Sequence, residues 1–263
     1  FIPRAFSITH INLTHRNWTA VGLPDCQELP IVDPRGLVTP FWDGWSLDCW
    51  IVTDDHRQLL PSRLPAVNQH LDYEHDDLAV QTDMVQDDLL LQLRSSVQMS
   101  SALPQCLLEI KAEAATAAWL VLALRPYNPE GIRFIHELVL AQDRRSWTVN
   151  GEEQVIFSEP AERHHLSTYK AGDVLLHLHD REEEEKGECN VGMLTGAVLF
   201  RLEPGQQRRL SVGVPLGAAE KNHTAPLVSW PSSLQGHCQL VVVRKRRAIT
   251  KAMVLPRVVA IIT

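Results

Sequence analysis

The sequence predicts an all-β protein, a large antiparallel β-sandwich with few or no long helices. Three observations support this prediction: apolar and polar residues alternate along many short segments, Gly, Pro and Asn mark turns between them, and helical periodicity is weak. The chain has 263 residues, of which 44% are hydrophobic and 22% charged. That balance is ordinary for a globular protein and gives a chain of this length ample material for a core.

Alternation is clearest in the segment 105–113, where Cys106, Leu108, Ile110 and Ala112 fall on one face and the charged residues on the other. The segments 131–142, 172–179 and 208–214 repeat the pattern. In 172–179 the alternation places His177 and His179 away from the apolar face. Strands with one apolar and one polar face are typical of antiparallel sheets that meet solvent on one side.

The segment 85–100 has a composition that also suits a helix, but its run of leucines fits a buried strand, and we predict a strand there. Asn150-Gly151 lies between two alternating segments and predicts a tight hairpin, because both residues tolerate positive φ angles. Glu203–Gln206 separates 197–202 from 208–214 and predicts a second hairpin. The two prolines in 125–131 predict a loop.

Charge is distributed unevenly along the chain. The formal net charge is −7, yet residues 221–263 contain no acidic residue and seven basic ones. We therefore expect a sandwich domain over residues 1–240 and a basic, apolar tail over 241–263, which we interpret as a truncated linker, an out-of-frame reading or a terminal strand with a basic extension. The acidic balance of the remainder argues against nucleic acid as a partner.

The five cysteines show no CxxC spacing, so the sequence predicts neither a zinc site nor a disulfide framework, and we expect reduced thiols in the cytoplasm. Histidines occur at His164, His165, His177 and His179, and we interpret them as solvated or hydrogen-bonded surface residues. We expect no metal and no other cofactor. The most apolar stretch, 114–124, is too short to span a bilayer, so no membrane partner is expected.

The most unusual local feature is a group of three of the seven tryptophans within residues 42–50. Indole rings beside carboxylates are what a sugar site uses, because the ring stacks on the sugar and the carboxylate accepts hydroxyl protons. The same residues could instead fill a core or an interdomain interface. We expect Trp50 in the core. The substrate or interface candidates are Trp42, Asp43, Trp45 and Asp48, with Trp42 and Trp45 in a loop or interface.

Recognised catalytic signatures are absent from the sequence: it has no GxSxG, HExxH, GxGxxG or Walker loop. Carboxylates are abundant, but nothing selects a pair for glycoside hydrolysis. We therefore assign no catalytic residue.

Four segments, Asn12–Trp18, Asp33–Trp45, Leu124–Gly131 and Leu202–Gly205, carry a family resemblance. Together they resemble the N-terminal β-supersandwich region of bacterial glucoamylase-like and glycogen-debranching-like glycoside hydrolases. The resemblance implies a bacterial carbohydrate-active enzyme in which a separate (α/α)6 barrel domain carries the catalytic acid and base. No position here matches those carboxylates.

The resemblance therefore implies a non-catalytic module whose partner is the barrel domain, with an α-glucan oligosaccharide as a further candidate ligand. Two alternatives remain open. One is a free-standing carbohydrate-binding β-sandwich protein, and the other is a complete enzyme that uses scattered carboxylates or histidines.

Overall fold

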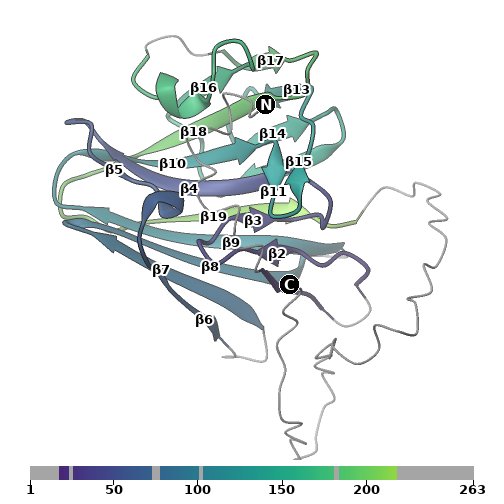
Figure 1. Ribbon diagram of the computed structural model, residues 1–263, viewed down its shortest axis with the longest axis horizontal. Helices are drawn as coiled ribbons and strands as arrows, with labels where there is room; N and C mark the ends of the chain where they lie inside the picture. The colour runs from purple at the N-terminus through teal and green to yellow at the C-terminus, as the bar shows by residue number, and fades with distance from the viewer. Residues whose placement is uncertain (1–17, 24–25, 73–77, 101–102, 181–183, 218–263) are drawn as a thin grey trace, which may run out of the picture.

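The computed structural model describes residues 18–23, 26–72, 78–100, 103–180 and 184–217. Two large antiparallel sheets stack face to face (Figure 1), which confirms the predicted all-β sandwich. The predicted tail 241–263 lies outside the described residues. None of the helices among the described residues is long and apolar enough to cross a bilayer.

The first sheet, sheet A, runs in the order β1 (Thr19–Ala20), β2 (Ile31–Val32), β3 (Val38–Thr39), β4 (Ser46–Thr53), β10 (Ala118–Arg125), β18 (Thr195–Leu202) and β16 (Arg163–Ser167), and β5 (Gln58–Leu59) pairs with β4. The second, sheet B, runs in the order β17 (Lys186–Glu188), β13 (Glu137–Leu140), β14 (Ser146–Val149), β15 (Glu153–Phe157), β19 (Arg208–Pro215), β9 (Leu103–Ala114), β8 (Leu89–Ser100), β7 (Ala79–Gln86) and β6 (Asn68–Asp72).

The main core lies between the two sheets. On β9 the predicted apolar face is buried there, from Cys106 to Ala112. Leu120, Leu122 and Leu124 of β10 pack against it from sheet A. The single strand predicted over 85–100 is confirmed only for 89–100, which form β8. A tight turn at 87–88, in which Asp87 has φ 55°, separates β8 from the end of β7.

A second apolar cluster covers the outer face of sheet A. Trp50 and Val52 of β4 lie there beside Val121 of β10 and Leu199 of β18. The 3-10 helix η2 (Val174–His177) and the residue after it lie over this face. The central strands of sheet A are therefore buried on both sides, unlike the one-sided strands that alternation predicted.

The strand predicted over 172–179 is wrong. Val174 and Leu175 are consecutive and both buried, whereas Leu176 is 59% exposed, a helical pattern rather than an alternating one. Asp173 begins the 3-10 turn, because its side chain accepts a hydrogen bond from the backbone N–H of Leu175 (2.9 Å). An N-cap residue at this position favours a helical turn over a strand.

The Asn150-Gly151 hairpin is confirmed. The two residues have φ angles of 52° and 74°, and the N–H of Glu152 donates to the carbonyl of Val149 (3.0 Å) between β14 and β15. The loop at 125–131 is confirmed as a connection, although it contains a short ribbon of β11 (Tyr127–Asn128) and β12 (Gly131–Ile132).

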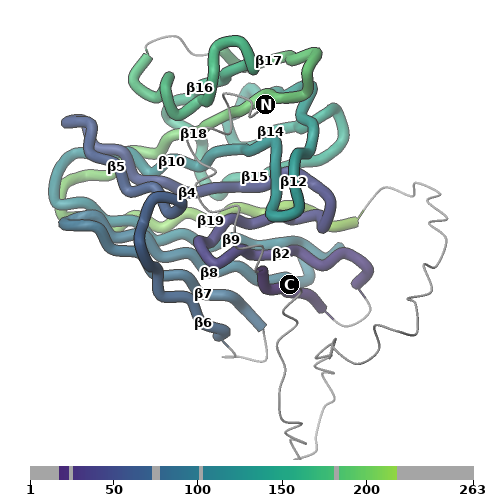
Figure 2. The backbone as a smooth tube through the Cα atoms, viewed as in Figure 1, coloured from purple at the N-terminus to yellow at the C-terminus, as the bar shows by residue number. Residues whose placement is uncertain are grey.

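The hairpin predicted at Glu203–Gln206 is wrong. A turn forms there, but it carries the chain from β18 in sheet A to β19 in sheet B, as the tube in Figure 2 shows. Residues 115–117 cross between the sheets in the same way, from β9 to β10. The N–H of Gly205 donates to the carbonyl of Ala114 (2.8 Å), so the two crossings are joined at one end of the sandwich.

Candidate functional site

A tight turn presents the first two candidate residues to solvent. The N–H of Gly44 donates to the carbonyl of Phe41 (2.7 Å), which leaves Trp42 and Asp43 at the tip of the turn. Trp42 is 61% exposed, and Asp43 is also exposed. An indole held in this way beside a carboxylate can stack on an apolar face while the acid accepts hydrogen bonds.

Asn128, in β11, holds the Trp42 turn in place. Its side chain is buried and donates to the carbonyl of Gly44 (2.9 Å). Its side-chain oxygen, Oδ1, accepts hydrogen bonds from the backbone N–H groups of Glu130 (2.8 Å) and Gly131 (3.1 Å). One buried amide therefore holds the Trp42 turn and the β11–β12 turn together.

Two further acids lie near this pair of turns. The Glu130 carboxylate accepts a hydrogen bond from the indole N–H of Trp18 (3.1 Å). Partial burial raises the pKa of Glu28, and the nearby charge of Asp43 adds to that rise. Aromatic and acidic side chains thus gather at this end of the sandwich.

Trp45 does not face solvent. It is 3% exposed, belongs to the main core and meets Phe41 edge to face, with ring centroids 6.1 Å apart. Trp45 thus lies in the loop that leads into β4, as predicted, but its side chain packs in the core of the sandwich and is not available to a substrate or a partner. Trp50 is buried as predicted, on the opposite face of β4 from Leu47 and Cys49.

Asp48 lies on the outer face of β4 and is only 5% exposed. Burial raises its pKa to about 7, although the Trp50 indole and the positive charge of Arg125 oppose that rise, and the charge of Asp33 adds to it. A carboxyl group with this pKa exchanges its proton near neutrality. Asp48 therefore belongs to a buried polar cluster and, unlike Trp42 and Asp43, does not face solvent.

An ion pair that sequence analysis did not identify forms the centre of this cluster. Arg125 and Asp173 are both completely buried and meet through two hydrogen bonds, one of 2.9 Å from Nη1 to Oδ1 and one from Nη2 to Oδ2. The guanidinium also lies over the rings of Trp50 (5.1 Å) and Tyr127 (5.4 Å). The pair joins the segment that begins η2 to the last residue of β10.

The four predicted residues thus occupy three environments: Trp42 and Asp43 an exposed turn, Trp45 the main core and Asp48 the outer polar cluster. Sequence analysis missed Asn128, Arg125 and Asp173. The available signal for Arg125 was a single charge at the end of the apolar run 118–124. The roles of Asp173 and Asn128 could not be assigned from the sequence, because Arg125 and Gly44, which they bind, are distant in the chain.

The histidines at 164 and 165 are buried, not at the surface as predicted. The Nε2 atom of His164 accepts from the indole N–H of Trp147 (3.1 Å), and its Nδ1 atom meets the carbonyl of Glu184. Burial lowers the pKa of His164 to about 4, which keeps the ring neutral. Among the described residues, no three His, Cys, Asp or Glu side chains come close enough to hold a metal ion.

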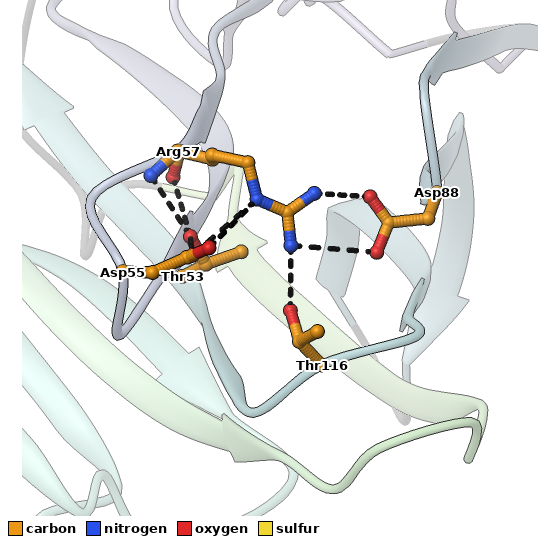
Figure 3. Close-up of polar contacts among 5 residues, drawn as sticks. All are labelled: Thr53, Asp55, Arg57, Asp88 and Thr116. Carbon is orange, nitrogen blue, oxygen red and sulfur yellow. Dashed lines mark hydrogen bonds and ion pairs between the residues drawn. The ribbon is translucent and has the colours of Figure 1, made fainter.

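The end of the sandwich opposite the Trp42 turn carries many charged side chains. It is formed by the loops 54–57, 87–88, 115–117 and 203–207, which we call the charged end. Arg57 connects three of these loops (Figure 3), because it binds Asp55 (3.1 Å), the carboxylate of Asp88 and the hydroxyl of Thr116 (2.7 Å). The loops thereby satisfy one another's polar groups.

No protein-family model matches this sequence, and no curated protein matches it. Among solved structures, it is similar to a bacterial glucoamylase complexed with acarbose, at 8% identity and a TM-score of 0.54, over 77% of this chain and 32% of that one. A polysaccharide lyase aligns at 10% identity and a TM-score of 0.36, over 75% of this chain and 32% of that one. The glucoamylase likeness establishes the fold, and this chain spans about a third of the glucoamylase's length.

Proposed function

We propose that this chain is a non-catalytic N-terminal β-sandwich module of a glucan-acting glycoside hydrolase, which packs against and supports a catalytic (α/α)6 barrel domain. The observation that carries the proposal is the alignment of this sandwich with one third of a bacterial glucoamylase chain. In this proposal the other two thirds of such an enzyme hold the reacting groups. The proposed compartment is the cytoplasm, which the free thiols of Cys26, Cys49, Cys106 and Cys189 support.

A second candidate function is that of a free-standing carbohydrate-binding protein. The exposed indole of Trp42 beside Asp43 favours it, because stacking and carboxylate hydrogen bonds are sufficient for weak sugar binding. This candidate needs no partner domain, so the two functions differ in what the purified chain does alone.

Calorimetry with malto-oligosaccharides separates the two. The module is expected to release no binding heat at millimolar sugar. A sugar-binding protein would release heat, and the Trp42→Ala substitution would abolish it. Phe134→Ala is the matched control, because Phe134 is an aromatic residue exposed to a similar degree (59%, against 61% for Trp42) whose ring lies beside His136 and not in the 41–44 turn.

Hydrolysis of an activated glycoside tests both candidates against a complete enzyme. The purified chain is expected to show no turnover. Turnover that a single Asp or Glu substitution abolishes would refute both proposals.

A further inference from the structure

The two ends of the sandwich differ in chemistry. The charged end carries side chains that pair with one another, including Arg57 with Asp88 and Arg201 with Asp54 (2.7 Å). We call the other end the exit end, because the described chain leaves β19 there through Leu216. It comprises the turns 41–44 and 126–132 and the paired ends of β8 and β9.

Three separate parts of the chain expose large apolar side chains at the exit end. They are Trp42 before β4, Ile132 of β12, and Met99 and Leu103 where β8 and β9 meet, with exposed fractions between 41% and 61%. In contrast, the loops 54–57, 87–88 and 203–207 contain no large apolar residue, although Val85 (66% exposed) lies beside the 87–88 turn. Exposed apolar side chains from several segments mark an interaction surface when they gather at one place.

The position of the exit end identifies the partner. Leu216 donates its backbone N–H to the carbonyl of Pro104 (2.8 Å), so the chain leaves the sandwich directly beside Leu103. Polypeptide that follows β19 therefore begins its path at this surface. The last residue pair of β19 is Pro215 with Gln105 of β9, at this end of the sandwich.

The size of the surface also favours a tethered partner. Four side chains cover much less than the roughly 800 Å² per partner that a stable bimolecular complex buries. A tethered domain faces an effective concentration of about 1 mM or more, so a small apolar contact is sufficient. A second copy of the chain would lack that advantage.

We infer that the exit end, formed by Trp42, Met99, Leu103 and Ile132, is the surface on which the domain following β19 docks. This inference rests on the proposed function and specifies its interface. The contact on the partner is apolar, and Asn128 keeps the Trp42 turn in a fixed position to receive it.

Hydrogen exchange tests the inference on the natural gene product that extends through the following domain, compared with the 263-residue chain. Docking is expected to slow exchange of the backbone amides in 41–45 and 126–133 by about tenfold in the longer protein. The triple variant Trp42→Ser, Met99→Ser and Leu103→Ser is expected to remove that protection.

The control is the triple variant Val85→Ser, Leu176→Ser and Val191→Ser, whose side chains are exposed to a similar degree but lie elsewhere. It is expected to keep the protection. Substitutions of exposed residues change stability little, so both variants are expected to fold. Thermal unfolding of each variant in the 263-residue chain verifies this.

Each outcome decides a different point. A gene product with no further folded domain would overturn the proposed function and this inference together. A following domain that protects other amides, or equal loss of protection in both triple variants, would overturn this inference alone. Dimers of the 263-residue chain at micromolar concentration, abolished only by the exit-end variant, would also overturn it, because the occupant would then be a second copy.

Discussion

Replacing Arg125 with methionine tests whether the buried ion pair holds η2 on the outer face of sheet A. Arg125 and Asp173 are both inaccessible to solvent, so the substitution leaves a buried carboxylate without its charged partner. Breaking such a pair costs about 3–5 kcal/mol. The loss of the guanidinium from the Trp50 and Tyr127 rings adds about 1 kcal/mol.

Urea unfolding followed by tryptophan fluorescence measures the free energy of unfolding at pH 7. The double variant Arg125→Met, Asp173→Asn is the control, because it removes both charges while the amide can still accept the Leu175 hydrogen bond. It is expected to recover most of the lost stability. A loss below about 1 kcal/mol, or a double variant no more stable than Arg125→Met alone, would refute the reasoning.

Three further predictions concern other buried or constrained residues. Because the pKa of His164 is lowered from 6.5 to about 4, the unfolded chain binds more protons between these values. His164 alone therefore removes about 3 kcal/mol of stability as pH falls from 6.5 to 4. The His164→Asn variant should therefore lose about 3 kcal/mol less stability than wild type over this pH range, as acid unfolding measures. Equal losses in the two proteins would show that His164 is not held neutral in the folded state. The effect of Asp48 on the pH dependence of stability has the opposite sign. Its pKa is raised from 3.8 to about 7, so the folded chain binds more protons than the unfolded chain between these values. Its contribution is lost as pH rises from 3.8 to 7, so Asp48→Asn should be stabilised relative to wild type at pH 7 but not at pH 4, and denaturant titrations at the two values decide this. Gly151 has φ 74°, so Gly151→Ala should lower the free energy of unfolding by about 1 kcal/mol and Gly151→Asn by less, whereas equal losses would show that the turn geometry is not the cause.

Local sequence chemistry predicted the strands and the tight turns, since both depend on neighbouring residues. The alternation in β9 and the Asn150-Gly151 turn are examples. It failed where a distant partner decides the outcome. The apolar residues of 172–179 fit a strand or a 3-10 turn equally well, and Asp173, bound to Arg125, favours the turn.

The candidate site shows the same limit. Trp42 and Trp45 have the same residue type and lie three positions apart, yet one is exposed and the other buried. The difference arises from the turn that ends at Gly44, which Asn128 fixes from far along the chain. Sequence analysis could predict an aromatic and acidic site in this region, but not which indole faces solvent.

The repeated crossing of the chain between the two sheets has a consequence for how this protein folds. Because the chain passes from β9 to β10 and from β18 to β19, the central strands of each sheet are sequence neighbours of strands in the other. Neither layer can therefore assemble from one continuous stretch of polypeptide, and the pairs β4–β10, β10–β18 and β9–β19 join residues that are far apart in the sequence. The protein should therefore fold slowly, and neither sheet should persist as a folded unit without the other.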